Sequence, residues 1–541
     1  MIEADYVVVG AGSAGCVVAG RLSEDGARVV VLEAGGSDRH PIIQVPAAVI
    51  RLMHHPRFNW NYVAEPEPGT AHRSIAWPRG KVLGGSGSIN GMNFVRGNPA
   101  DFDGWAQMGC RGWSYEEVLP HFKSVERRQG GDRSFRGEAG PIPVENYRTV
   151  LPIVRSFVAA AVEAGFRFTS DINGESQEGV GYSQMNRTRV RQSTARTFLR
   201  PAARRANVRV LTHAHATRLL FEGKRCVGVA FRGNGTETEV RARREVILSG
   251  GSINSPQLLQ ISGIGPAAQL QAIGVRARHH LEGVGSGLID HYQARVSYRI
   301  AGTASVNEYS RGAKLLWEMA KWATVGSGAL TFGITQVSVF ARSREGLASP
   351  DLQLLFVPGS FERLGVMDRE PGVSLTVCPG RPDSRGSVMA RSPDPFAPPV
   401  IRPNYLAAAS DRQTLVAGLR IARRIFQQPA IARYCVGEIA PGPGRISDEA
   451  LLQYARETGG SVYHPVGTCR MGEDAQAVVD SRLRVRGLGG LRVVDASVMP
   501  TLTTGNTQAP TIMIAEKGAA MIAEDWRAAG ASSHPRRWQA T

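Results

Sequence analysis

The chain has 541 residues, 42% of them hydrophobic and 21% charged, and its formal net charge is +17 at pH 7. This length allows a large core in two intertwined domains, and the composition excludes the disordered and fibrous classes. No apolar run approaches the roughly 20 residues that a transmembrane helix needs. We therefore predict a folded protein without an integral membrane segment.

The positive charge comes almost entirely from arginine, since only six residues are lysine. Basic surfaces are typical of proteins that bind nucleic acids or anionic membranes. No segment here combines basic residues with interleaved aromatic residues, as a nucleic-acid interface would. We predict no nucleic-acid partner, and a partner for the arginine-rich surface stays an open question.

The six cysteines are scattered and form no Cys-x-x-Cys pair. This spacing is typical of a reducing compartment, and it gives neither a disulfide framework nor a metal site. The first predicted strand begins almost at the N-terminus, which leaves no room for a signal peptide. We predict a cytoplasmic protein that holds no metal.

The first elements form a dinucleotide-binding pattern. An apolar strand at 6–9 leads into Gly10, Gly12 and Gly15, a helix follows to residue 21, and a second strand covers 28–32. These glycines allow a tight turn, a close approach of pyrophosphate and close helix–strand packing, while the helix N-terminus attracts phosphate. Glu33 ends the second strand, where a carboxylate accepts the ribose hydroxyls.

A second run rich in small residues covers 78–93. So many small residues indicate a backbone that passes close to something flat or charged. The apolar residues Val82, Leu83, Ile89 and Met92 favour a buried segment over a flexible surface loop.

The next predicted elements continue the first domain and add a small β-meander to it. Helices are predicted at 116–126, 151–164 and 193–199, and strands at 208–211, 216–221, 226–231, 237–241 and 245–249. This order is typical of a doubly wound α/β sheet with a small β-meander. The glycines of 283–287 lack the third spacing of a second fingerprint, so NAD(P)H is not expected.

From about residue 293 the pattern changes to that of a second domain. Strands at 337–342, 352–357, 373–378 and 386–390 are separated by turns rich in proline and glycine, and helices are predicted at 410–427 and 447–457. Such spacing favours an antiparallel sheet. A buried strand at 491–495 and a helix at 511–525 return to the first domain.

Several long motifs together resemble the glucose–methanol–choline (GMC) oxidoreductases, in particular choline dehydrogenase-like and sorbose dehydrogenase-like bacterial members. They are the N-terminal fingerprint, Gly80–Asn90 with Phe94 and Gly97, Gly251–Gly265, His464–Gly472 and Val494–Asn506. The resemblance implies an FAD-dependent enzyme that oxidises alcohols. It implies an FAD-binding domain of residues 1–150, 195–292 and 470–527, a substrate-binding domain of 151–194 and 293–469, and a disordered tail of 528–541.

The resemblance also assigns roles to particular residues. His464 matches the active-site histidine, and Asn506 matches the second active-site position. The implied cofactor-binding residues are Gly10, Gly12, Ser13, Ala14, Gly15, Glu33, Ala34, Lys81, Val82, Leu83, Gly84, Gly85, Ser86, Asn90, Gly91, Met92, Asn93, Ala216, Asp495, Ala496, Thr507 and Gln508. Relatives that bind FAD covalently do so through a histidine at the position of Ile89, so FAD is expected to be non-covalent here.

The chemistry needs such residues, because an alcohol proton is too weakly acidic to leave unaided at neutral pH. A positioned imidazole can accept that proton, and Asn506 can hydrogen-bond the same substrate oxygen. Val462 and Tyr463 precede His464 and are expected at the substrate, where apolar Val462 is a hint of oxidase activity.

The substrate is expected to be a neutral alcohol, such as a sugar, a polyol, or an aryl or furanic alcohol. Choline-oxidising relatives pair the quaternary ammonium with a glutamate, and Gln336 stands at the aligned position, which argues against choline. Choline dehydrogenase-type activity, a redox-neutral hydroxynitrile-lyase-like reaction and a non-enzymatic flavoprotein remain alternatives. The electron acceptor (oxygen, a quinone or another carrier) and the oligomeric state stay open.

Overall fold

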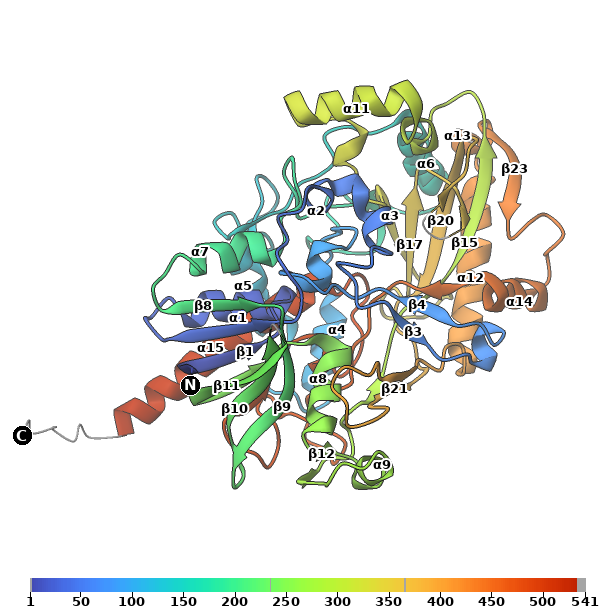
Figure 1. The fold of residues 1–541 in the computed structure, drawn as a ribbon. Coiled ribbons are helices and arrows are strands. Elements are labelled where there is room, and N and C mark those ends of the chain that lie inside the picture. Colours follow the sequence, from blue (N-terminus) through green and yellow to red (C-terminus); the bar gives the residue numbers. More distant parts are fainter. Residues whose placement is uncertain (1, 234, 364–365, 533–541) are drawn as a thin grey trace, which may run out of the picture.

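The computed structural model describes residues 2–233, 235–363 and 366–532 (Figure 1). Two seven-stranded sheets dominate the fold, and each has its own hydrophobic core. One sheet mixes parallel and antiparallel strands, and the other is antiparallel. The prediction of a doubly wound α/β domain with a second α+β domain on an antiparallel sheet is confirmed.

The first sheet has the strand order β8-β2-β1-β11-β10-β9, and β25 pairs with β11. Its strands are β1 (Ile2–Val9), β2 (Val29–Glu33), β8 (Val208–Thr212), β9 (Ala214–Glu222), β10 (Arg225–Gly233), β11 (Thr236–Leu248) and β25 (Leu491–Val493). The apolar run of β1 is central, because β1 pairs in parallel with both β2 and β11. Strands buried on both faces are typical of such parallel pairings.

The prediction of two separate strands at 237–241 and 245–249 was wrong, because β11 runs without a break. The charged residues Arg243, Arg244 and Glu245 interrupt the apolar pattern. The register shifts there, since Ala4 pairs with Ala242 but Tyr6 pairs with Glu245. A β-bulge thus absorbs the extra residue and keeps the strand whole.

Helices α1 (Ser13–Leu22), α5 (Tyr115–Val125) and α15 (Gln508–Ser532) pack beside the first sheet, with α15 against both others (Figure 1). Helix α15 is longer at both ends than the predicted 511–525. The predicted disordered tail of 528–541 is therefore wrong for residues 528–532, which are helical, and residues 533–541 lie outside the described part.

The second sheet has the order β23-β15-β20-β17-β16-β7, and β24 pairs with β15. Its strands are β7 (Gly179–Tyr182), β15 (Tyr292–Ile300), β16 (Val337–Ala341), β17 (Leu352–Val357), β20 (Gly372–Pro379), β23 (Cys435–Ala440) and β24 (Gly460–Ser461). Helix α12 (Ala409–Phe426) packs on β15, β17 and β20, and it in turn contacts α6 (Pro152–Glu163) and α14 (Asp448–Thr458). Helices thus cover one face of this sheet.

The strand predicted at 386–390 is present, but it does not belong to the large antiparallel sheet. It is β21 (Gly386–Met389), which lies between β14 (Ser286–Leu288) and β22 (Val400–Arg402) in a separate three-stranded sheet. The remaining strands are β3 (Tyr62–Ala64), β4 (Ile75–Trp77), β5 (Glu126–Arg127), β6 (Ile142–Pro143), β12 (Ile264–Gly265), β13 (His279–His280), β18 (Phe361–Arg363) and β19 (Val366–Met367). The exact domain limits stay a prediction.

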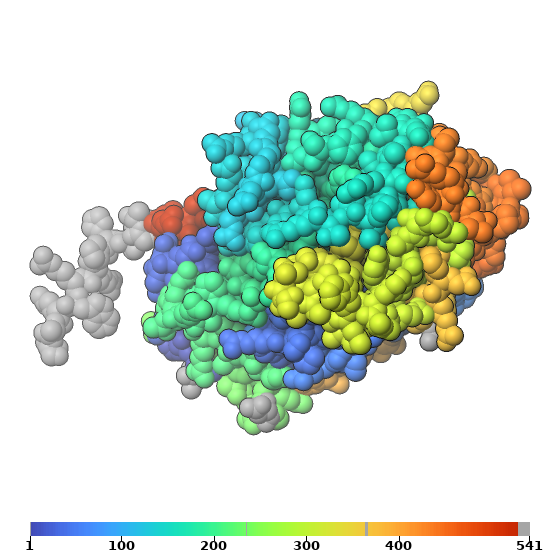
Figure 2. Space-filling model, turned by 90° about the horizontal axis from the view of Figure 1, so that it is seen from above, coloured from blue at the N-terminus to red at the C-terminus, as the bar shows by residue number. Residues whose placement is uncertain are grey.

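The other helices connect these layers. They are α2 (Pro41–Gln44), α3 (Val49–Leu52), α4 (Pro99–Gln107), α7 (Arg200–Ala202), α8 (Gly251–Ile261), α9 (Ala267–Ala272), α10 (Val306–Tyr309), α11 (Gly312–Val325) and α13 (Pro429–Ala432). Seen from above, α11 lies in yellow across the middle of the face that Figure 2 presents. Each helix in the described part of the chain is too short or too polar to span a lipid bilayer.

Candidate active site

A cavity of about 360 Å³ is lined by residues of both large sheets. The first sheet contributes the carboxyl ends of β1 and β2, and the second contributes side chains of β15, β17 and β20. Ligands of α/β sheets bind at the carboxyl ends of parallel strands. The cavity therefore joins a dinucleotide half to a second half that the antiparallel sheet supplies.

The dinucleotide half begins at the N-terminus of α1. Its N-cap residue Gly12 makes no side-chain cap, and no acidic residue lies in the first turn. A β-carbon on Gly12 would lie 3.8 Å from the nearest atom, the Ser249 carbonyl oxygen, whereas one on Gly15 would lie 1.9 Å from the Gly10 oxygen. Gly15 therefore allows tight backbone packing, and Gly12 leaves free amides and space for a phosphate.

Glu33 lies at the end of β2, and its side chain is buried in the cavity wall. Its carboxylate accepts hydrogen bonds from the backbone amides of Ala11 (2.9 Å) and Gly35 (2.8 Å). Burial nevertheless raises the pKa of Glu33 to about 7. Further donors, such as ribose hydroxyls, would favour the ionised form.

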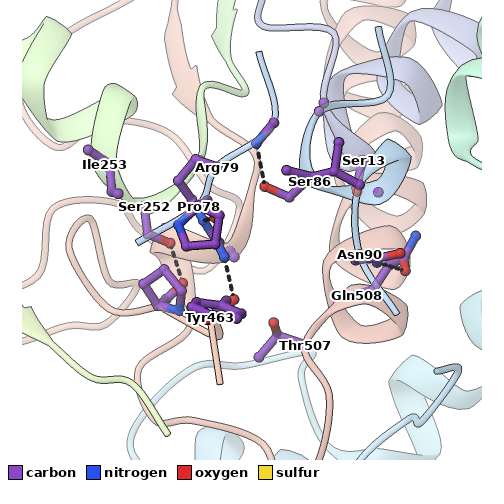
Figure 3. Close-up of a pocket in the computed structure, with 18 of the residues that line it drawn as sticks. Ser13, Pro78, Arg79, Ser86, Asn90, Ser252, Ile253, Tyr463, Thr507 and Gln508 are labelled. Carbon is purple, nitrogen blue, oxygen red and sulfur yellow. Dashed lines mark hydrogen bonds between the residues drawn. The ribbon is translucent and has the colours of Figure 1, made fainter. Parts of the chain in front are cut away.

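The second glycine-rich segment packs directly against the first. The Gly84 amide donates to the Ala11 oxygen at 2.7 Å, and a β-carbon on Gly85 would lie 2.7 Å from the Gly12 α-carbon. Asn90 hydrogen-bonds the side chain of Gln508, as Figure 3 shows. The two segments thus form one wall of the cavity.

Two buried polar atoms in this wall lack a partner among the described residues, Nε2 of Gln508 and Oδ1 of Asn93. Both residues line the cavity. Buried polar atoms are normally satisfied, so these two fit the polar edge of a bound cofactor. Together with the open helix terminus and Glu33, they fit FAD.

Most of the predicted cofactor residues line the cavity. Those that do are Gly10, Gly12, Ser13, Ala14, Glu33, Ala34, Gly85, Ser86, Asn90, Gly91, Met92, Asn93, Ala216, Asp495, Ala496, Thr507 and Gln508. Gly15, Lys81, Val82, Leu83 and Gly84 are not among its lining residues. The stretch 81–84 lies behind the wall because its backbone bonds to Phe58, Gly36 and Ala11.

His464 lies in a chain of hydrogen bonds in the second half of the cavity. Its Nε2 atom is 3.1 Å from Nδ2 of Asn506, and Oδ1 of Asn506 accepts from Gln353 at 3.2 Å. Its backbone amide donates to Asp290 at 2.7 Å, and its Nδ1 atom is 2.9 Å from Nδ1 of His291. The two predicted active-site residues are therefore in contact, and their orientation is fixed on both sides.

The environment of His464 favours a neutral imidazole. Burial lowers its pKa well below the usual value, and the nearby His291 and the positive charge of Arg79 lower it further. Arg79 lies in the same wall and donates to the Tyr463 oxygen at 2.6 Å (Figure 3). A neutral imidazole with a free electron pair can accept a hydroxyl proton.

Of the predicted substrate residues, Val462 and Tyr463 line the cavity, but Gln336 does not. Its neighbours Ile334 and Thr335 both line the cavity, whereas Gln336, which directly precedes β16, is not among the lining residues. The Gln336 amide is buried and has no side-chain partner in the described part of the chain. Because it lies outside the cavity lining, Gln336 gives no evidence against choline as a substrate.

Sequence reasoning missed several polar residues of this half, among them Arg79, Gln293, Arg295 and Thr376. Gln293 and Arg295 alternate along β15 and so share its cavity face, and Thr376 pairs with Arg295 across the sheet. A polar side chain at every second position of a buried strand was the available signal. Within the described ranges, no group of side chains could hold a metal ion.

Two models of the GMC oxidoreductase family match the chain, one at residues 4–293 and the other at residues 382–515. The chain belongs to this family. Its members bind FAD, so the protein is an FAD-dependent alcohol oxidoreductase, as the sequence predicted.

The chain is 42% identical over 526 residues to an oxygen-dependent choline dehydrogenase of Rhizobium etli, covering 96% of this chain and 95% of that one. It is 44% identical over 532 residues to a protein of the same name from Pseudomonas savastanoi pv. phaseolicola, covering 95% and 92%. The structure resembles pyridoxine 4-oxidase from Mesorbium loti, with a TM-score of 0.87, 30% identity and coverage of 98% and 100%.

Proposed function

We propose that the enzyme oxidises a CH–OH group and that His464 takes the hydroxyl proton. The observation that carries this proposal is the hydrogen bond between His464 and Asn506 at the wall of the FAD-type cavity. When bound, FAD supplies a flavin that accepts a hydride from the alcohol carbon. The protein's part is to orient the alcohol and hold the proton.

The side chains around His464 support the two roles of the protein, which are to orient the alcohol and to take its proton. Asn506 offers Nδ2 to an oxygen that also approaches Nε2 of His464, so the two groups can fix one hydroxyl. Ser252, labelled in Figure 3, and Pro465 close the wall beside them, since the Ser252 hydroxyl donates to the Pro465 oxygen at 2.6 Å. Burial of this site excludes bulk water from the proton transfer.

Choline is the specific substrate that the names of the two relatives support, and oxygen is the acceptor that they support. The expected neutral alcohol is the competing candidate. Ile89 lines the cavity and has no group that could bond covalently to a flavin, which supports non-covalent FAD. The six cysteines are free thiols, which supports a reducing, cytoplasmic location.

Anaerobic bleaching of the purified yellow protein tests this function. Mixing with choline, sorbose, benzyl alcohol and hydroxymethylfurfural should remove the absorbance of the oxidised flavin with at least one alcohol. Readmitting air then distinguishes an oxidase from a dehydrogenase. A flavin that dithionite reduces, but that no alcohol reduces, would contradict the proposal and favour the lyase or binding-protein alternatives.

A further inference from the structure

The substrate half of the cavity contains a positive charge without a negative partner. The described lining of the whole cavity includes two carboxylates, Glu33 and Asp495, and both already accept hydrogen bonds. Glu33 accepts from Ala11 and Gly35, while Asp495 accepts from the Gly251 amide and the Ser255 hydroxyl. Neither forms an ion pair with an arginine of the cavity.

Arg295 is that positive charge. Its guanidinium carbon lies 5.4 Å from the ring centre of Phe361, another cavity residue. Among the described residues, no side chain hydrogen-bonds the guanidinium and no carboxylate pairs with it. A half-buried cation without an anionic partner in the cavity wall leaves its hydrogen-bond donors unpaired, so a negative group is expected to enter from outside the chain.

The other arginine of the cavity is differently placed. The Nε atom of Arg79 donates to the Pro78 oxygen at 2.6 Å, and its Nη2 atom donates to the Tyr463 oxygen. Arg79 is thus tied to the backbone, and its charge acts on His464. The N–H groups of the Arg295 guanidinium, in contrast, remain available to hydrogen-bond a ligand.

The neighbours of Arg295 fit an anion as well. Across the sheet, Arg295 pairs with Thr376, and Thr376 pairs with Leu355, so the three form one row on the cavity wall. The Thr376 hydroxyl makes no hydrogen bond within the part of the chain that the structure describes. Gln293, two residues before Arg295 on the same face, adds an amide.

We propose that the alcohol oxidised by this enzyme carries a carboxylate, which binds the Arg295 guanidinium. The planar fork of arginine matches a carboxylate with two parallel hydrogen bonds. The quaternary ammonium of choline would instead meet a like charge, and the two carboxylates of the described lining, Glu33 and Asp495, already accept hydrogen bonds from the protein. This inference rests on the proposed alcohol oxidation and refines its substrate class, and it predicts that choline is a poor substrate.

In the reaction, the hydroxyl proton goes to His464, the hydride leaves the carbon for FAD, and an aldehyde forms with the carboxylate unchanged. Pairs of alcohols that differ only in the charge of the group distant from the hydroxyl test the role of the carboxylate by itself. We would compare 3- to 6-carbon ω-hydroxyalkanoates and 4-(hydroxymethyl)benzoate with their uncharged amides, and with choline, in anaerobic flavin reduction by the holoenzyme.

The best carboxylate should reduce the flavin at least about tenfold more efficiently than its amide. Arg295→Gln should lower the efficiency with the carboxylate by roughly 10- to 100-fold, because a charge-assisted hydrogen bond is lost. The same change should leave the amide within about threefold and should not impair choline. Arg299→Gln is the control, since Arg299 lies on the same strand, outside the cavity, and pairs with Glu370.

Equal efficiency with carboxylates and amides, or a preference for choline, would overturn the inference while leaving alcohol oxidation intact. Failure of every alcohol to reduce the flavin would overturn the proposed function with it. If Arg295→Gln does not fold with FAD, Arg295→Lys and the carboxylate-to-amide ratio of the unaltered enzyme decide the question.

Discussion

Nδ1 of His464 lies 2.9 Å from Nδ1 of His291, and Nε2 of His291 lies 3.1 Å from the Gly380 oxygen. A carbonyl oxygen only accepts, so His291 donates from Nε2. Burial lowers the pKa of His291 to about 4, so this ring is neutral and its Nδ1 accepts. His464 must therefore carry its proton on Nδ1, which leaves the electron pair of Nε2 for Asn506 or a substrate hydroxyl.

We predict that His291 acts as a positioning residue for His464. His291→Phe keeps an aromatic ring but removes the acceptor, so His464 can turn or change tautomer. The rate of flavin reduction should fall roughly 10- to 100-fold, the range typical when a metal-bound histidine loses its hydrogen-bond partner. FAD content should be unchanged, and the acid limb of the rate profile should move. His121→Phe, outside the cavity, is the control. An unchanged rate and pH profile would exclude this role.

The lowered pKa of His464 predicts an unusual pH dependence of activity. Only the neutral imidazole accepts a proton, and the neutral form persists to lower pH when the pKa is lowered. The efficiency of flavin reduction should thus stay constant from pH 8 to pH 6.5, the usual pKa of histidine, and decline only below it. Arg79→Gln removes a positive charge beside His464, so it should shift the decline to higher pH. A midpoint at pH 6.5 or above in the unaltered enzyme would contradict the assignment.

Glu33 predicts that FAD affinity depends on pH. Its pKa is about 7 because the carboxylate is buried, and only the ionised form accepts hydroxyls without losing its bonds from Ala11 and Gly35. FAD binding should therefore release a proton, and affinity should rise with pH below 7, by up to about tenfold per pH unit. Titration of the apoprotein with FAD between pH 5.5 and 8 measures this. Glu33→Gln should bind more weakly and without this slope, and an equal slope in both proteins would refute the explanation.

Two glycines of the fingerprint should respond differently to the same substitution. In Gly15→Ala the new β-carbon would meet the Gly10 oxygen at 1.9 Å, so the variant should be insoluble or strongly destabilised. In Gly12→Ala the nearest atom is 3.8 Å away, so the variant should fold but bind FAD poorly, because the methyl group occupies phosphate space. Thermal unfolding and flavin content measure the two effects. A stable, yellow Gly15→Ala protein would contradict this packing.

The sequence was most informative for segments in which a hydrophobic or glycine pattern coincides with a motif of known chemistry. The β1–α1–β2 unit follows from its apolar runs and glycine spacing, and the resemblance pointed to His464 and Asn506, which the fold brings to 3.1 Å. The cavity face of the second sheet was harder. Alternation along β15 does not reveal which face meets the cofactor domain, so Arg295 escaped notice. Alignment with choline-oxidising relatives put Gln336 at the substrate, but Gln336 directly precedes β16 and is not among the residues that line the cavity.

The central claim is that His464 removes the substrate proton, and rapid anaerobic mixing of His464→Ala with the best alcohol tests it most directly. Both proteins would first be matched for flavin content. The account predicts that the rate constant of flavin reduction falls at least about 100-fold, because loss of a general base costs that much or more. A rate constant within about tenfold of the unaltered enzyme would contradict it.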